Sequence, residues 1–362
     1  MRRVLLPAAL AMTMAAGSLP AQPRLHEPVV ATHMADASAA VVSRDGLLLV
    51  ANDEDNILRW YDPATGGAPV RELALDDFLG VRPDTKGPEA DFEAVARVGD
   101  AIVLVGSHGR NKNGKERPMR HRFVALAEDE EGVVALAGSS MRVDLAARLA
   151  RDPRHAALGL WSSIRQGEKL ADAQEERLAP KNEGFNIEAL SATESGATLF
   201  IGLRNPRVLD AANGKDLALV ATLLNPREYL GAGAPPQFGE PLLWDLDGLG
   251  MRSMERHPVT GLQYIVAGPV GGGGPFVLYA WNEDPQSAPQ NLVQFPDGLS
   301  VEGLAAIPGE RAMWIVSDDG AVPVPVASND ECLGDLDKGG NCQNKSLRDP
   351  ARRTFRIARL DL

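Results

Sequence analysis

Apolar and polar positions recur in the same order five times along this chain. A short polar step leads into an apolar run, a turn follows, and about ten residues later a second apolar run ends in a polar or glycine-rich segment. The five units begin at Asp36 (DASAAV), Asp91 (DFEAVA), Asn186 (NIEALS), Met251 (MRSMER) and Ser300 (SVEGLA). Short β-rich units that repeat and are separated by turns predict a repeated β architecture.

Most units contain four predicted strands. The second unit shows them clearly, in apolar segments that begin at Phe92, Ala101, Arg122 and Gly132. Four antiparallel strands make up one blade of a β-propeller. The last unit lacks a fourth strand, because its final segment, TFRIARLDL from Thr354, matches the third strands of the other units. The segment PVVATH from Pro28 can take that place, which would close the ring and remove its exposed sheet edges.

We therefore predict an all-β fold, a β-propeller of five four-stranded blades, or of six if the insertion described next contains another. Because the units extend from end to end, we expect a single domain over residues 28–362. A solenoid is the alternative, but its terminal units would be capped rather than complementary.

The segment between the second and third units, residues 143–185, has a different pattern. Its leucines follow a loosely helical spacing, and Asp152 followed by Pro153 is typical of a helix start. We expect a helical insertion here, which either packs over a blade or forms a lid or wall of a site.

The first 21 residues have the pattern of a signal peptide. Arg2 and Arg3 precede an apolar run, Val4 to Ala16, and small residues lead to a cleavage site after Ala21. The alternative is a buried first helix. The run is too short to cross a bilayer, and no later segment is long enough, so we predict no membrane span and a periplasmic or secreted protein.

The net charge of the chain limits the kinds of partner that it can bind. The net charge is −12 over 362 residues, which argues against nucleic acid or an anionic membrane surface as a partner. We expect a monomer. The two cysteines, Cys332 and Cys342, lie close together in a loop rich in Asp, Asn and Gly, and in an exported chain this favours a disulfide over a metal site.

Three glutamates occupy the same place in their units, namely Glu93, Glu188 and Glu302. In a propeller the first strand of each blade lines the central channel, so these carboxylates should converge, and they repel unless a cation or a shared proton lies between them. We predict Ca²⁺, a hard cation with several oxygen ligands, and Asp318 as a further ligand. The alternatives are that the carboxylates hold the blades together by hydrogen bonds, or act as acid and base without metal. In the other two units the place holds serine, at Ser38 and Ser253.

A basic loop, residues 107–122, contrasts with the acidic chain. It contains six Lys or Arg and two His against one Glu. It leaves the second strand of the second unit, so its first residues should reach the same mouth as Glu93. The loop residues concerned are His108, Arg110, Asn111 and Lys112. Matching positions in the third unit hold Arg204 and Asn205. Arginines in such a place can clamp a phosphate or carboxylate, or they neutralise the acidic ring internally.

These positions define a candidate site for an anionic small molecule. We assign His108 as a proton shuttle, and Arg110 and Arg204 as groups that stabilise developing negative charge. The substrate-binding candidates are Asn111, Lys112, Asn205 and Asp53.

Several motifs taken together resemble the DUF3616 family of bacterial proteins, whose function is unassigned. The matching segments are ANDEDN, DFEAVA, GSHGRNKNGKERPMRHRF, NIEALS, IGLRNP, GLGMRSM, SVEGLA and the paired cysteines. More distantly, the D-x-E-[AG]-[LV] modules are similar to those of exported esterase-like phytase propellers. That similarity implies calcium and phosphoester hydrolysis.

The sequence thus predicts an exported propeller that binds an anionic small molecule at the mouth of its channel. In the enzymatic version it is a metal-dependent hydrolase of phosphoesters or lactones, in which the cation polarises the ester oxygen and activates water. The alternative is a non-catalytic propeller that binds a ligand or a protein, since the fold is compatible with both.

Overall fold

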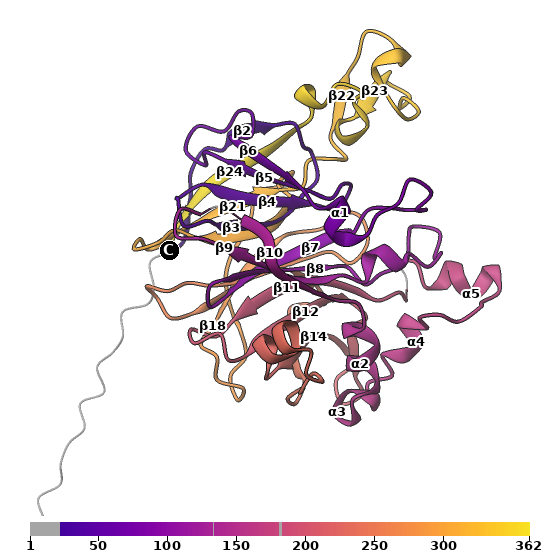
Figure 1. The fold of residues 1–362 in the computed structure, drawn as a ribbon, viewed down its shortest axis with the longest axis vertical. Helices are drawn as coiled ribbons and strands as arrows, with labels where there is room; N and C mark the ends of the chain where they lie inside the picture. Colours follow the sequence, from indigo (N-terminus) through magenta and orange to yellow (C-terminus); the bar gives the residue numbers. More distant parts are fainter. Residues whose placement is uncertain (1–21, 133, 181–182) are drawn as a thin grey trace, which may run out of the picture.

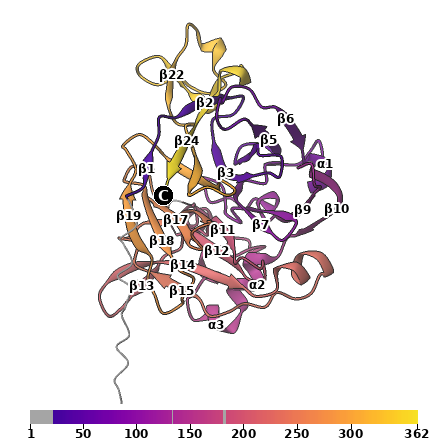
Figure 2. The same cartoon turned by 90° about the vertical axis from the view of Figure 1, so that its left-hand side faces the viewer.

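The computed structural model describes residues 22–132, 134–180 and 183–362. Five antiparallel sheets are arranged as the blades of a propeller (Figure 1), and in Figure 2 they succeed one another in colour order around the middle of the molecule. This confirms the predicted five-bladed β-propeller. The predicted signal peptide, residues 1–21, lies outside the described residues.

Blades one, two and four each contain four strands in sequence order from the centre outward. Blade one consists of β3 (Ala37–Val42), β4 (Leu48–Asn52), β5 (Ile57–Tyr61) and β6 (Arg71–Ala74). Blade two consists of β7 (Phe92–Val98), β8 (Ala101–Gly106), β9 (Phe123–Glu128) and β10 (Val134–Arg142). Blade four consists of β16 (Gly250–Arg256), β17 (Gln263–Gly268), β18 (Val277–Trp281) and β19 (Gln290–Gln294). A short helix, α1 (Asp76–Leu79), joins the first two blades.

Blade three carries an extra short strand. It consists of β11 (Asn186–Ala192), β12 (Leu199–Asn205), β14 (Lys215–Leu223) and β15 (Leu242–Trp244), with β13 (Val208–Asp210) paired to β14. A π-helical turn, η2 (Glu228–Ala232), lies between β14 and β15.

Blade five joins the two ends of the described chain. Its three C-terminal strands are β20 (Val301–Ala306), β21 (Ala312–Ser317) and β24 (Thr354–Asp361). The N-terminal strands β1 (Arg24–Leu25) and β2 (Val29–Thr32) both pair with β24. The predicted closure by an N-terminal strand is therefore confirmed, and the strand pairing begins slightly before residue 28.

Apolar side chains fill the space between every two neighbouring blades. The inner strands β3, β7, β11, β16 and β20 contact one another in a closed ring. Between blades three and four, the rings of Phe200 and Trp281 meet edge to face with centroids 5.2 Å apart. Between blades five and one, Tyr61 and Phe355 do the same at 5.0 Å. Burial of this apolar surface holds the blades at fixed positions around the axis.

Four short helices form the insertion between blades two and three. They are α2 (Leu145–Arg151), α3 (Pro153–Ala156), α4 (Trp161–Ile164) and α5 (Asp172–Arg177). The side chain of Asp152 caps α3 by accepting a hydrogen bond from the backbone N–H of Arg154. Leu145, Leu149 and Leu160 pack into the apolar cluster shared by blades two and three. The predicted helical insertion is confirmed, and its helices α2 and α4 pack against the blades.

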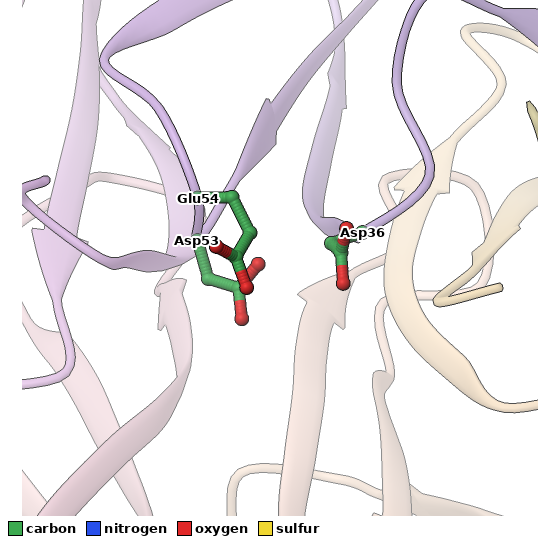
Figure 3. Close-up of side chains that lie close together, drawn as sticks. All are labelled: Asp36, Asp53 and Glu54. Carbon is green, nitrogen blue, oxygen red and sulfur yellow. The ribbon is translucent and has the colours of Figure 1, made fainter. Parts of the chain in front are cut away.

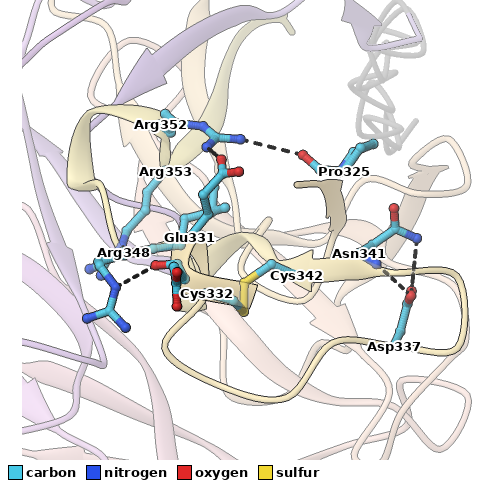
Figure 4. Close-up of a disulfide and its surroundings, with 11 residues drawn as sticks. Pro325, Glu331, Cys332, Asp337, Asn341, Cys342, Arg348, Arg352 and Arg353 are labelled. Carbon is cyan, nitrogen blue, oxygen red and sulfur yellow. Dashed lines mark hydrogen bonds and ion pairs between the residues drawn. A yellow bond between two sulfur atoms is a disulfide. The ribbon is translucent and has the colours of Figure 1, made fainter. Parts of the chain in front are cut away.

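A lobe between β21 and β24 projects from the propeller (Figure 1). We call residues 323–353 the disulfide lobe, because Cys332 and Cys342 are bonded within it, as predicted (Figure 4). Its elements are β22 (Pro323–Pro325), η3 (Asn329–Glu331), β23 (Asn341–Gln343), η4 (Asn344–Ser346) and η5 (Pro350–Arg352). Within the described part of the chain, no helix has the length and apolar character needed to cross a membrane.

Candidate functional site

Each inner strand carries a bulge at the same place. The pairing with the second strand of the blade shifts register at one residue, which leaves that residue out of the ladder. The five bulge residues are Ser38, Glu93, Glu188, Arg252 and Glu302. All of them except Ser38 line one cavity at the mouth of the central channel. The three glutamates predicted to converge therefore do face a common space.

In the fourth repeat, the bulge lies one residue before the position that we had aligned with the three glutamates. We aligned Ser253 with the glutamates, but the bulge of β16 places Arg252 there. Arg252 is buried, with 6% of its surface exposed. The ring of bulge residues thus contains a guanidinium, and the sequence-based alignment missed it.

The cavity is large and strongly polar. It has a volume of about 1300 Å³. The lining carboxyl groups are those of Asp36, Asp53, Glu54, Glu89, Asp91, Glu93, Glu188, Asp297, Glu302, Asp318 and Asp335. The lining cations are Lys112, Arg117, Arg120, Arg204, Arg252 and Lys345. The excess of carboxyl groups favours a cation in this space, unless neighbouring residues neutralise them.

Arg252 supplies the positive charge for two of the predicted metal ligands. Its Nη1 lies 2.9 Å from Glu188 Oε2 and 2.7 Å from Glu302 Oε1. Arg204 Nη1 lies 2.6 Å from the other oxygen of Glu188. Because Glu188 and Glu302 already have cationic partners, we remove them from the set of expected calcium ligands. Burial still raises the pKa of Glu302 to about 8, although Arg252 opposes the rise.

A different group of carboxylates has the geometry of a cation site. Oxygens of Asp53, Asp91 and Glu93 all lie within 4.8 Å of one another. Asp53 comes from the loop after β4 in blade one, whereas Asp91 and Glu93 come from the start of β7 in blade two. Arg120 Nη1 lies 2.8 Å from Asp91 Oδ2, so one member of the group has a counter-charge.

The other two members lack such partners. Asp53 Oδ1 is buried and has no hydrogen-bond partner among the described residues. Glu93 makes no ion pair with any residue that the structure describes. Burial, and then the neighbouring carboxylates, raise the pKa of Asp53 and of Glu93 well above their ordinary values. Without a cation, burial and repulsion therefore oppose the ionisation of both groups.

A second acidic group shares Asp53. Oxygens of Asp36, Asp53 and Glu54 also lie within 4.8 Å of one another (Figure 3). Here Lys345 of the disulfide lobe is the cation, with its Nζ 2.6 Å from Glu54 Oε1 and 3.4 Å from Asp36 Oδ1. Burial raises the pKa of Asp36 to about 7, against the opposing effect of Lys345. The disulfide lobe thus delivers a lysine into the acidic mouth, which the repeat pattern did not predict.

Asp318 lines the cavity at the end of β21. Its Oδ1 accepts a hydrogen bond of 2.8 Å from the backbone N–H of Gly320. Burial raises its pKa. It lies in blade five and belongs to neither of the two carboxylate groups described above.

Two of the basic-loop residues that we assigned to the site, His108 and Arg110, do not line the cavity. His108 is buried with φ +54°, its ring stacks on that of His121 with centroids 5.5 Å apart, and neither ring nitrogen has a partner among the described residues. Burial, and then His121, lower its pKa well below the ordinary value. Arg110 donates hydrogen bonds to the carbonyl oxygens of Gly114 and Arg165. We therefore withdraw His108 as a proton shuttle and Arg110 as a charge-stabilising group, because packing turns both side chains inward.

Of the other predicted site residues in the basic loop and at the end of β12, three line the cavity and one does not. Asn111 and Lys112 line the cavity. Arg204 lines it too, but its guanidinium is held by Glu188 and the carbonyl oxygen of Val270. Asn205 donates to the carbonyl oxygens of Gly184 and Pro180, so it anchors the end of the helical insertion.

Several cations of the cavity were not predicted from the sequence. Arg117 and Arg120 belong to the basic loop that we singled out, and only its first residues were expected at the mouth. Aligning the fourth repeat from Gly250 would have identified Arg252. For Lys345 we find no signal, because it lies outside the repeats.

Comparisons with known proteins identify a family. Residues 36–312 match the model of the family described as "Protein of unknown function (DUF3616)". No curated protein shows significant similarity to the chain.

Three solved structures match the backbone of this chain at low sequence identity. The glutaminyl cyclase of Myxococcus xanthus has 9% identity and a TM-score of 0.43, over 94% of this chain and 96% of that one. The β-propeller domain of Cps50 (Swd1) from Myceliophteria thermophila has 10% identity and a TM-score of 0.36, over 93% and 99%. A chain of the mitotic checkpoint complex has 11% identity and a TM-score of 0.33, over 97% and 98%.

Proposed function

The chain belongs to the DUF3616 family of proteins of unknown function, and we propose that it is a β-propeller that binds Ca²⁺ at the mouth of its channel and, through this ion, an anionic small molecule. The proposed ligands are the carboxylates of Asp53, Asp91 and Glu93. The formation of the disulfide supports an oxidising, exported location for this activity.

The observation that carries the proposal is the unmet demand of Asp53 and Glu93 for positive charge, beside an Asp91 that pairs with Arg120. Their oxygens lie within 4.8 Å of one another, and buried Asp53 Oδ1 has no hydrogen-bond partner among the described residues. A buried, unpaired acceptor is costly, and so is repulsion between neighbouring carboxylates. A divalent cation removes both costs at once.

The donor set fits a hard cation. Ca²⁺ takes six to eight oxygen ligands in flexible geometry, so about half of its positions would remain for oxygens of water or of a bound anion. When bound, such an ion polarises a phosphoryl or carbonyl oxygen and lowers the pKa of coordinated water. The protein would hold the ion with Asp53 and Glu93, and Arg120 would keep Asp91 ionised and oriented.

Hydrolysis of a phosphoester or lactone is the second candidate function. The cavity, with a volume of about 1300 Å³, has room for a whole ester beside the carboxylates. Binding without catalysis remains our first proposal, because His108, the assigned proton shuttle, is buried away from the cavity.

Calcium titration of the mature protein tests the proposal. After treatment with a chelator, we expect isothermal calorimetry to detect one calcium ion per chain, and calcium to raise the melting temperature. Glu93→Gln should weaken calcium binding at least about tenfold, because the site loses one of its three charges. Absence of calcium binding in the wild-type protein would refute the proposal.

Glu188→Gln is the matched control, since Glu188 has the same bulge position in the next blade. We expect this variant to keep its calcium affinity within about threefold of wild type, because the carboxylate of Glu188 forms ion pairs with Arg204 and Arg252 and is not a proposed calcium ligand. Equal loss of calcium affinity in both variants would contradict the assignment of ligands. Turnover of phosphoester and lactone substrates, lost in Glu93→Gln, would establish the hydrolase.

A further inference from the structure

The cations that line the cavity are of two kinds. Four of them form ion pairs with carboxylates, namely Arg120, Arg204, Arg252 and Lys345. Lys112 and Arg117 form none with any described residue. The only side-chain hydrogen bond of Arg117 in the described structure is to a backbone carbonyl, that of Glu116. These two side chains therefore bring positive charge to the cavity that no carboxylate of the described structure neutralises.

The loop that carries Lys112 and Arg117 is fixed to its surroundings. Asn111 Oδ1 accepts hydrogen bonds from the backbone N–H groups of Asn113 and Lys115, which closes a tight turn around Lys112. The amine of Lys115 contacts Asp172 and Glu175 of α5. The helical insertion thus holds this loop as a preformed wall of the cavity.

Arg117 is held from the other side by Gly87. A Cβ atom at Gly87 would lie 2.5 Å from Arg117 Cδ, so the arginine side chain runs directly over this glycine, whose φ is +59°. Close packing of the aliphatic stem restricts the guanidinium without neutralising it. A restricted guanidinium loses less entropy when it binds an anion.

We propose that Lys112 and Arg117 bind a second anionic group of the ligand, so that the ligand is a small molecule with two separated anionic groups, phosphate or carboxylate. This inference rests on the proposed function, in which the first anionic group is bound by calcium at Asp53, Asp91 and Glu93. Forked hydrogen bonds from the Arg117 guanidinium and the point charge of the Lys112 ammonium suit either type of group.

Three six-carbon probes test the inference. Fructose 6-phosphate has one anionic group, fructose 1,6-bisphosphate adds a phosphate, and 6-phosphogluconate adds a carboxylate at the far end. Binding of each is measured by calorimetry with saturating calcium and again with a chelator. The proteins are wild type, Lys112→Gln, Arg117→Gln and the control Lys169→Gln, which changes an exposed lysine outside the cavity.

We expect at least one of the two-group probes to bind wild type and Lys169→Gln about tenfold or more tightly than fructose 6-phosphate. The probe that does so identifies the second group as phosphate or carboxylate. In Lys112→Gln and Arg117→Gln this gain should fall to about threefold or less, with calcium affinity and melting temperature unchanged. A gain that persists in both variants, or failure of both two-group probes to exceed fructose 6-phosphate, would overturn the inference.

The two proposals can fail separately. If the wild-type protein binds no calcium, the proposed function fails, and the titrations with chelator still measure whether Lys112 and Arg117 discriminate in favour of a second anionic group. If calcium binds but the second group adds no affinity, only the inference about these two cations fails.

Discussion

Arg252 and Glu93 occupy the same bulge position in blades four and two, with opposite charges. On the side of Arg252, guanidinium groups neutralise Glu188 and Glu302. On the side of Glu93, the carboxylates of blades one and two have fewer positive partners. The channel mouth is therefore divided into an internally paired half and a half that demands an external cation.

Replacement of Arg252 by methionine should destabilise the protein. Loss of this side chain would leave buried Glu188 with a single cationic partner and Glu302 with none of its present ion pairs. Removal of one partner from a buried pair typically costs about 3–5 kcal/mol. Denaturant unfolding should show this loss in the free energy of unfolding, whereas Arg311→Met, at an exposed arginine, should change it little. Equal stabilities of the two variants would contradict a structural role for Arg252.

Replacement of Lys345 by methionine should create a second cation site. The amine of Lys345 neutralises Glu54 and Asp36 in the acidic group of Figure 3. Without it, calorimetry should detect a second calcium ion per chain, or tighter binding of the first, because the two groups share Asp53. Lys338→Met, in the same lobe but exposed, is the control. An unchanged calcium isotherm in Lys345→Met would refute the prediction.

Stability of the calcium-free protein should depend on Glu255 as the pH rises. Burial raises the pKa of this carboxyl from 4.5 to about 8, so the native state keeps a proton that the unfolded chain has released. Its contribution to stability is therefore present at low pH and is lost between about pH 5 and pH 8. Thermal melts with a chelator should show Glu255→Gln gaining stability relative to wild type across this range. A constant difference between the two proteins would show that Glu255 does not titrate there.

Reduction of the Cys332–Cys342 disulfide should lower the local stability of the disulfide lobe and leave that of the blades unchanged. The bond spans 10 residues, and opening such a loop costs about 2–3 kcal/mol. The lobe has its own small apolar cluster, in which both cysteines pack with Leu347. Hydrogen exchange should therefore accelerate in residues 323–353 but not in β20 or β21. Parallel loss of protection in those strands would show that lobe and propeller unfold together.

The repeat pattern was sufficient to predict the architecture. Alternation of side chains and the turn after each apolar run are local properties, so five blades could be counted without knowing any contact. The unmatched segment from Pro28 and the three-stranded last unit predicted the closing pair of β2 and β24, because an open ring would leave sheet edges exposed. The spacing of Cys332 and Cys342 likewise predicted their bond.

Tertiary structure alone decided which charges meet. A bulge interrupts the alternation of each inner strand, so which residue of the fourth repeat faces the cavity, Arg252 or Ser253, depends on how that repeat is aligned with the others. Lys345 reaches the mouth from a lobe outside the repeats, and packing against the helical insertion turns Arg110 inward while Lys112 lines the cavity. Local sequence specifies the alternation within a strand, whereas the partners of a charge depend on which distant segments pack together.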